Sequence, residues 1–305
     1  MQADGQAAHG ALHFAEFNGV ARTHGVAAAL VMILDLVDEG ADFAGEVWFI
    51  GTVGEEVGMQ GALDLVEGGY LDAVDGIVIP EPTKRDGENQ AIFASKGSIM
   101  YTIHGEGKAA HSSMPELGIN AIMTAAEFIQ KTQKDFDAVT NNPDYRNEDL
   151  GATLNVFSVI EGGRQFNSVP DHVTIKGNAR TVPEYDSARA VELLQKNVDA
   201  NNENPENATL TLELNQVLDA AAAKKDTALI RALKEAGKDK NVQVRPLIGT
   251  CELSRYIHLG DVDLVVYGPG LTKMAHKIDE YIELDEYEDT IRIFKDMAVA
   301  FTESK

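Results

Sequence analysis

Two adjacent glutamates, Glu55 and Glu56, follow a short apolar run in the segment GTVGEEVG, residues 51–58. The run EVWFI before the segment is β-branched and aromatic and ends at a glycine, which predicts a buried strand. Two carboxylates at the end of such a strand repel each other and are costly to desolvate. Either they lie in a solvated loop, or they divide the work of a hydrolytic site, in which one binds a metal ion and the other takes a proton from water.

Further candidate metal ligands follow two other apolar runs. Glu81 ends the segment GIVIPEPT, residues 76–83, where a carboxylate has little structural reason to be. His276 follows a glycine-proline-glycine turn in GPGLTKMAHKIDEY. Carboxylate and imidazole groups from separate strand ends are common ligands of zinc. A single histidine is more often structural, so the case for His276 depends on the other two segments.

The elements that must position these residues alternate between helix and strand. The apolar patterns predict helix 25–36, strand 46–53, helix 58–69, strand 76–83, helix 226–236, strand 263–270 and helix 285–301. This alternation is typical of an α/β layer with a mostly parallel sheet. Sites in such sheets lie beyond the carboxyl ends of the strands, where the three glutamates fall.

A segment with a different pattern interrupts the α/β alternation. It predicts strand 98–107, helix 119–136, strand 153–163, strand 172–182, helix 187–203 and strand 208–217. The order βαββαβ is typical of a self-contained ferredoxin-like domain. The sequence therefore predicts one domain at residues 96–218 inserted into another made of residues 1–95 and 219–305.

The composition excludes some classes of partner. The chain has 305 residues, a length that favours two domains, and 49 acidic against 26 basic residues give a formal charge of −23. Nucleic acids and anionic membranes need a basic face, so we expect neither as a partner. The one cysteine, Cys251, permits no intramolecular disulfide and fits a cytoplasmic location. We also expect no secretion signal and no membrane span, because no apolar stretch is long enough.

Several segments, taken in order, resemble the co-catalytic zinc amidohydrolases. They are GTVGEEVG, IPEPT, GKAAHSSMPELGINAI, the pair NSVP and NARTVPEYD, and GPGLTKMAHKIDEYIELDE. This family includes succinyl-diaminopimelate desuccinylase, acetylornithine deacetylase, aminoacylase and several carboxypeptidases and dipeptidases. The AHSSMPELGINAI stretch is most similar to the desuccinylase and deacetylase-like branch of Gram-positive bacteria. The resemblance implies an α/β zinc-hydrolase catalytic domain with an inserted ferredoxin-like lid and dimerisation domain.

The resemblance also implies roles for the matched residues at the reacting bond. Glu55 would be the general base. Glu56, Glu81 and His276 would ligate two zinc ions, with cobalt and manganese as alternatives because these ligand types suit all three. His111 would polarise the scissile carbonyl across a dimer interface, although it is also what an ordinary surface histidine looks like.

Other matched residues would bind the substrate. The resemblance implies that Asn167 and Arg180 hold a substrate carboxylate, for which a bidentate guanidinium is well suited. Arg180 is alternatively a strand residue in an exposed salt bridge. The GTCELSRY loop, residues 249–256 with Thr250, would close on the substrate. The implied activity is metal-dependent hydrolysis of an amide bond in an N-acyl amino acid or small peptide, by a homodimer.

The chain departs from the family's pattern near its beginning. The family has a His-x-Asp after an early strand and an aspartate that bridges both metals before the first long helix. No His-x-Asp precedes the turn GVARTHGVAAAL, and the bridging position falls on Ala21. His9 and His13, four residues apart, are either substitute ligands or accidental composition. We expect an N-terminally incomplete or divergent ligand segment and weak metal binding, with a catalytically impaired relative as the alternative.

Overall fold

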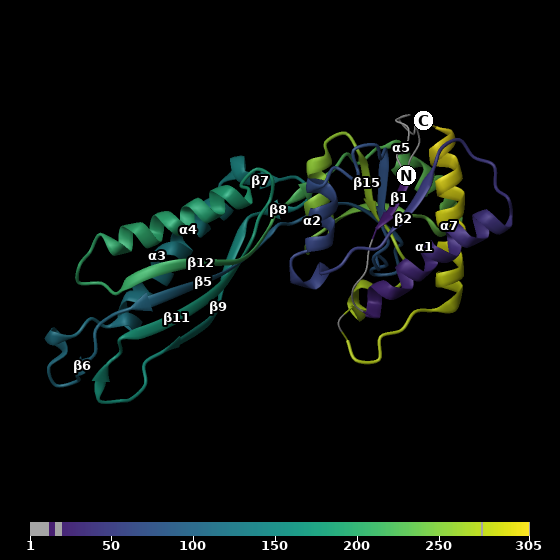
Figure 1. Ribbon diagram of the computed structural model, residues 1–305. Helices are drawn as coiled ribbons and strands as arrows, with labels where there is room; N and C mark the ends of the chain where they lie inside the picture. Colours follow the sequence, from purple (N-terminus) through teal and green to yellow (C-terminus); the bar gives the residue numbers. More distant parts are fainter. Residues whose placement is uncertain (1–11, 16–19, 276, 305) are drawn as a thin grey trace. The chain divides into compact units, whose positions relative to one another are not determined.

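The chain divides into two compact units, shown in a computed structural model that describes residues 12–15, 20–275 and 277–304, with side chains from residue 24 onward (Figure 1). Residues 1–95 and 221–305 form the first, here called the α/β unit, and residues 96–220 form the second, here called the inserted unit. Within the described part of the chain, no helix is long and apolar enough to cross a membrane.

The α/β unit is built on a seven-stranded sheet with the order β13–β4–β15–β3–β1–β2, and β14 pairs with β4. Its parallel part consists of β2 (Val47–Ile50), β1 (Leu12–Ala15), β3 (Gly76–Ile79) and β15 (Asp263–Val266). Strand β4 (Gln90–Ser95) runs antiparallel to β15 and to β13 (Ala221–Ala222), and parallel to β14 (Gln243–Leu247). The predicted α/β fold with a mostly parallel sheet is confirmed.

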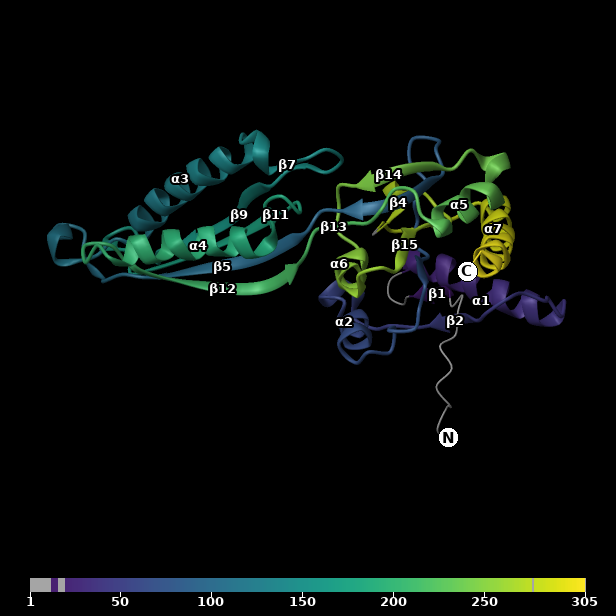
Figure 2. The same ribbon diagram turned by 90° about the horizontal axis from the view of Figure 1, so that it is seen from above.

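Helices cover both faces of this sheet (Figures 1 and 2). Helices α1 (Val20–Asp38), α5 (Ala228–Ala236) and α7 (Leu284–Glu303) lie on one face, and α2 (Gln60–Glu67) and the short α6 (Leu253–Tyr256) lie on the other. Strand β3 is buried at all four positions, as a strand covered on both faces requires. The core includes Met32, Ile79, Val265, Phe294 and Phe301.

The inserted unit contains a four-stranded antiparallel sheet with the order β12–β5–β11–β9. Its strands are β5 (Ser98–Glu106), β9 (Leu154–Gly162), β11 (His172–Arg180) and β12 (Thr209–Leu218). Helix α3 (Ala121–Thr140) follows β5, and α4 (Ser187–Asn202) follows β11. The chain order βαββαβ, with the first strand between the third and the last, confirms the predicted ferredoxin-like fold.

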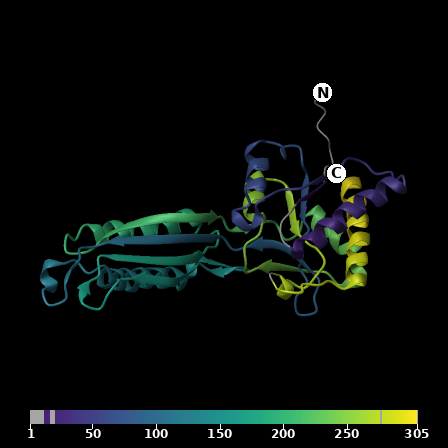
Figure 3. The same cartoon turned by 60° about the horizontal axis from the view of Figure 1, so that its bottom comes forward.

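The two helices of the inserted unit share one core with the sheet (Figure 3). Alternate residues of the strands point toward them, because successive side chains of a strand face opposite sides. The fully buried members of this core include Ile99, Tyr101, Ile103, Ile175 and Leu194. Two small ribbons complete the unit: β6 (Ala110–His111) with β10 (Ser168–Val169), and β7 (Arg146–Asn147) with β8 (Gly151–Ala152).

Three helices begin at capping side chains that accept backbone hydrogen bonds. Asn120 accepts from the amide of Met123 at the start of α3, at 3.1 Å. Asp186 does the same at the start of α4, and Thr227 at the start of α5. Such caps satisfy amides that have no partner inside the helix, so they fix where each helix begins.

Besides the two-residue strands β6, β7, β8, β10 and β13, four longer elements were not predicted from the sequence: β1, β4, β14 and α6. Strand β1 (LHFA) has no β-branched residue, unlike the predicted four-residue strands β2, β3 and β15, and α6 is too short to show a helical period. Strand β14 contains Pro246, beside which its register with β4 shifts, and a proline normally argues against a strand. Strand β4 is buried at all six positions but lies directly before the inserted unit.

Gly177 of β11, where the register with β9 shifts, leads to a first prediction. A β-carbon at this position would lie 2.3 Å from both the Cζ atom and the hydroxyl of Tyr101. Gly177→Ala should therefore overpack the core and lower the free energy of unfolding by about 1–3 kcal/mol, measured by urea denaturation. Gly249→Ala is the control, since its new β-carbon would make only ordinary contacts of 3.7 Å or more. An unchanged urea midpoint for Gly177→Ala would contradict this packing.

The Tyr101 hydroxyl leads to a second prediction, on pH. It donates to Asn155 Oδ1 at 2.8 Å, and burial raises the pKa of Tyr101 although this hydrogen bond acts in the opposite direction. The raised pKa stabilises the fold fully below about pH 10, and this stabilisation is lost as the pH rises through the titration range of the folded protein.

The variant Tyr101→Phe tests this. It should cost about 1 kcal/mol near pH 8, because Asn155 loses a donor. Above about pH 10 its unfolding free energy should fall less steeply than that of the wild type. Urea unfolding near pH 8 and above about pH 10 measures how the unfolding free energy of each protein changes with pH. An equal change in Tyr101→Phe and in the wild type would refute the prediction.

Candidate active site

The two adjacent glutamates lie on a tight turn between β2 and α2, here called the glutamate turn, residues 54–59. A single 3₁₀ turn, Glu55–Val57, is flanked by Gly54 and Gly58, whose φ angles of 79° and 107° favour glycine. The amide of Met59 donates to the carbonyl of Gly54 at 2.7 Å and closes the turn. As a result the two side chains diverge: Glu55 is 4% exposed, whereas Glu56 is exposed and lines a pocket.

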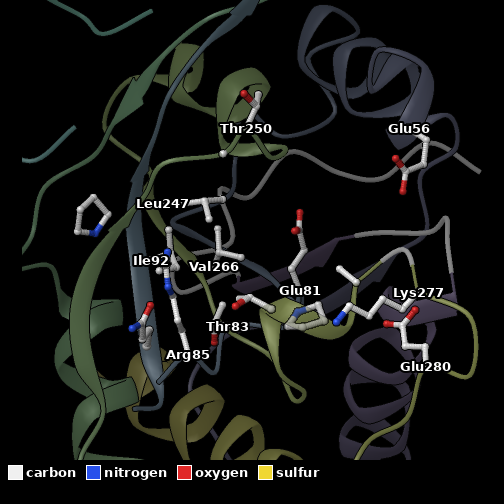
Figure 4. A pocket seen from close by; sticks show the side chains of 16 residues that line it. Glu56, Glu81, Thr83, Arg85, Ile92, Leu247, Thr250, Val266, Lys277 and Glu280 are labelled. Atoms are coloured by element: carbon white, nitrogen blue, oxygen red, sulfur yellow. The ribbon is translucent and has the colours of Figure 1, made fainter. Parts of the chain in front are cut away.

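This pocket, of about 440 Å³, lies within the α/β unit (Figure 4). The carboxylates of Glu56 and Glu81 face it from different walls, and Thr250 lies on a further wall. Apolar side chains, among them Ile92 and Leu247, line another part. The remaining charged lining residues are Arg85, Lys277 and Glu280. The pocket thus offers carboxylate donors next to a surface that accepts apolar groups.

The pocket brings together three of the predicted site residues: Glu56, Glu81 and Thr250. Glu55 is buried and is not among the lining residues. His276 lies outside the described residues, while residues 275 and 277 line the pocket. The position of Ala21 falls in α1, with no described side chain, and His9 and His13 are likewise without described side chains.

Whether the pocket suits a metal ion depends on its carboxylates. Glu56 and Glu81 are donors of the type that zinc, cobalt and manganese accept. Among residues 24–275 and 277–304, no three histidine, cysteine, aspartate or glutamate side chains gather closely enough to hold a metal ion. The described residues therefore fit a metal as part of a ligand set that needs at least one further member.

A second group of predicted residues meets in the inserted unit. Strand β6 ends at His111 and pairs with β10, so that His111 lies opposite Ser168. The amide of Ser112 donates to the carbonyl of Asn167 at 3.0 Å. This ribbon brings His111 and Asn167, which are far apart in the sequence, to the same exposed end of the unit.

The hydrogen bonds of His111 select one neutral tautomer. Its Nδ1 atom receives the backbone N–H of Ser113 at 3.2 Å and lies 2.7 Å from the Ser113 hydroxyl. Because a backbone N–H can only donate, Nδ1 is the acceptor and the proton of a neutral ring is on Nε2. His111 thus presents an Nε2–H donor, the group needed to polarise a carbonyl.

Arg180 lies at the opposite end of β11 from Asn167. The nine residues of β11 (His172–Arg180) separate the two, which at about 3.3 Å per residue is on the order of 30 Å. Burial lowers the pKa of Arg180. Burial likewise lowers the pKa of Lys96, and the neighbouring positive charges of Arg146 and Arg180 lower it further. Arg180 therefore belongs to a cationic group that cannot share a small ligand with Asn167 of the same chain.

The sequence analysis missed one residue of the α/β unit, Glu252. Its side chain is fully buried and accepts a hydrogen bond from the hydroxyl of Thr52, before the glutamate turn, at 3.1 Å. It follows Cys251 in the GTCELSRY loop. An acidic residue inside the otherwise apolar stretch CEL was the available signal.

Comparisons with known proteins agree with the motifs. Residues 93–206 match the family model of the peptidase dimerisation domain. The chain is 34% identical over 304 residues to a probable succinyl-diaminopimelate desuccinylase of Staphylococcus epidermidis, covering 92% of this chain and 73% of the relative.

Two solved structures have a similar fold at low identity. An M20 family metallo-carboxypeptidase of Sulfolobus solfataricus aligns with a TM-score of 0.77 and 17% identity, over 98% of this chain and 86% of that chain. A dinuclear metal-binding peptidase of the M20 family from Bacillus subtilis aligns with a TM-score of 0.70 and 15% identity, over 99% and 84%. The expected resemblance is confirmed, and this chain belongs to the M20 family of amidohydrolases and peptidases, which act on C–N bonds.

Proposed function

We propose that this chain hydrolyses an amide bond in an N-acyl amino acid or a small peptide, with metal bound in the pocket of the α/β unit. The observation that carries the proposal is that Glu56 and Glu81, which follow separate parallel strands, face one cavity together with Thr250 (Figure 4). The name of the staphylococcal relative supports an N-succinyl amino acid as one substrate class.

Glu56, Glu81 and His276 would hold the metal, which is zinc in our proposal, with cobalt or manganese as alternatives. A bound metal would lower the pKa of a water molecule and polarise the scissile carbonyl. Glu55 would take the proton of the attacking water on a carboxylate oxygen and deliver it to the leaving amine. Its place beside Glu56 on the same turn supports this role, which also requires the buried Glu55 carboxylate to turn toward the pocket that it does not line here.

His111 and Asn167 would act on the substrate from the inserted unit. His111 would donate its Nε2–H to the carbonyl oxygen as negative charge develops there. Asn167 and Arg180 would hold the substrate carboxylate. Because these two residues of one chain lie on the order of 30 Å apart along β11, a substrate that touches both needs two chains. We therefore propose a site shared between the two chains of a homodimer.

The edge strand β9 is the proposed dimer contact. It forms one edge of the sheet and exposes the apolar residues Leu154, Val156, Val159 and Ile160. An exposed apolar edge is a ready template for pairing with another chain. The match to the peptidase dimerisation domain supports the inserted unit as the lid and dimerisation domain, and the α/β unit as the catalytic domain. A cytoplasmic location remains proposed on the single cysteine.

One observation favours a second function. The position where the family has its bridging aspartate is Ala21, and a methyl group cannot bridge two cations. A chain with this substitution would bind ligand or dimerise without turning over substrate. Zinc binding and hydrolysis together separate the two functions.

Zinc binding gives the third prediction. The wild type should bind zinc and hydrolyse N-succinyl or N-acetyl amino acids or dipeptides, whereas Glu56→Gln and Glu81→Gln should lose at least about tenfold in zinc affinity. Glu280→Gln is the matched control, because Glu280 lines the same pocket but belongs to no implied ligand set. Elemental analysis and calorimetry measure the binding. A wild type that holds no zinc would favour the second function.

The oligomeric state gives the fourth prediction. Val156→Lys places a charge on the exposed β9 edge, where Val156 is 59% exposed, and should convert a dimer to a monomer at micromolar concentration in sedimentation velocity. Leu214→Lys is the control, since Leu214 is 43% exposed on β12, the opposite edge strand. A wild type that sediments as a monomer would refute the shared site.

A further inference from the structure

The segment that follows β14 contacts residues before and after Glu55 and Glu56 in the sequence. Before the turn, the Thr52 hydroxyl donates to Glu252 Oε1 at 3.1 Å, in a buried hydrogen bond. At its end, Arg255 Nη2 donates to the carbonyl of Gly58 at 2.7 Å, and the buried Ser254 hydroxyl lies 3.5 Å from the sulfur of Met59. Glu252, Ser254 and Arg255 thus contact residues that flank Glu55 and Glu56 in the sequence.

The backbone of the turn needs such support. Gly54 and Gly58 have positive φ angles, and Met59, which is not a glycine, has φ 57°. A non-glycine residue in this region is strained and persists only when the surrounding structure imposes it. Both Ser254 and Arg255 contact the residues at this end of the turn. The contacts from α6 therefore act where the turn is least stable by itself.

The same segment also reaches the pocket. Gly249 and Thr250 line it, together with Glu56 and Glu81. Three residues later the chain enters α6, whose Leu253 and Tyr256 are fully buried and fix the helix in the core. One short segment is thus part of the pocket wall at its beginning and holds the glutamate turn at its end.

We propose that Glu252 and Arg255 are positioning residues for Glu55 and Glu56, acting through Thr52 and Gly58. Their hydrogen bonds hold the glutamate turn in the conformation that directs the Glu56 carboxylate into the pocket. The inference rests on the proposed function in one respect, that Glu56 is a metal ligand. The geometry of the turn itself does not depend on that role.

The test compares variants that remove one contact with matched controls elsewhere in the α/β unit. Thr52→Val and Arg255→Lys remove the two hydrogen bonds. Thr302→Val removes a buried hydroxyl bond within α7, and Arg292→Lys removes a guanidinium bond to the carbonyl of Ala236. The controls lose hydrogen bonds of the same kinds without touching the turn: those of Thr302 to the carbonyls of Ala298 and Val299, and those of Arg292 to Ala236 and Asp239.

The first readout is hydrogen exchange of the amides of residues 54–59 in metal-free protein, followed by mass spectrometry. Exchange should become about tenfold faster in Thr52→Val and Arg255→Lys and stay unchanged in both controls. Glu252→Gln keeps an acceptor for the Thr52 hydroxyl and should exchange like the wild type, whereas Glu252→Met should not. Equal exchange in all variants would overturn the inference.

The second readout is zinc affinity by calorimetry. Thr52→Val and Arg255→Lys should bind zinc about 10–100-fold more weakly than the wild type, the usual loss when a residue that orients a ligand is changed. If the wild type binds zinc and both variants bind it equally well, the inference fails while the proposed function stands. If the wild type binds none, the proposed function fails, and the exchange of the metal-free turn decides the inference alone.

Discussion

The candidate site depends on the parallel pairing of β2, β1, β3 and β15. Parallel strands in register end at the same edge of a sheet, and here Ile50 pairs with Ala15 while Val266 pairs with Ile79. The glutamate turn follows β2 and Glu81 follows β3, so the pairing of the strands places both at that edge. The pocket forms among the loops that leave the sheet at this edge.

Within those loops, backbone geometry decides what each carboxylate can do. Glu55 and Glu56 are neighbours in sequence, yet the short 3₁₀ turn between two glycines of positive φ directs one side chain inward and the other to the pocket. Hydrogen bonds support this turn from outside: Glu252 accepts one from Thr52, just before the turn, and Arg255 of α6 donates one to the carbonyl of Gly58. The chemistry of the pair is thus tied to a helix about 200 residues away in the sequence.

Much of this arrangement could be predicted from the sequence, and the exceptions have physical reasons. The α/β layer and the ferredoxin-like unit were predictable because their longer helices show a period and most of their strands are apolar, β-branched runs. Strand β1 was not, since LHFA has no β-branched residue, and helix α6 was not, since its four residues show no helical period. The motifs predicted Glu56, Glu81 and Thr250 as members of one site, and the three line one pocket. The buried Glu252 was not predicted as a site residue, because its contact with the site is a hydrogen bond from Thr52 that no local sequence pattern encodes.

The inserted unit imposes a further constraint, which concerns assembly. His111 and Asn167 are joined by the β6–β10 ribbon at one end of the unit, and Arg180 ends β11 at the other. A strand hydrogen-bonded on both sides, as β11 is to β5 and β9, cannot bend to bring its ends together. Since no small substrate spans on the order of 30 Å, a single chain cannot use Asn167 and Arg180 on one molecule. In the proposed homodimer, the apolar β9 edge is the contact through which a second chain would complete such a site.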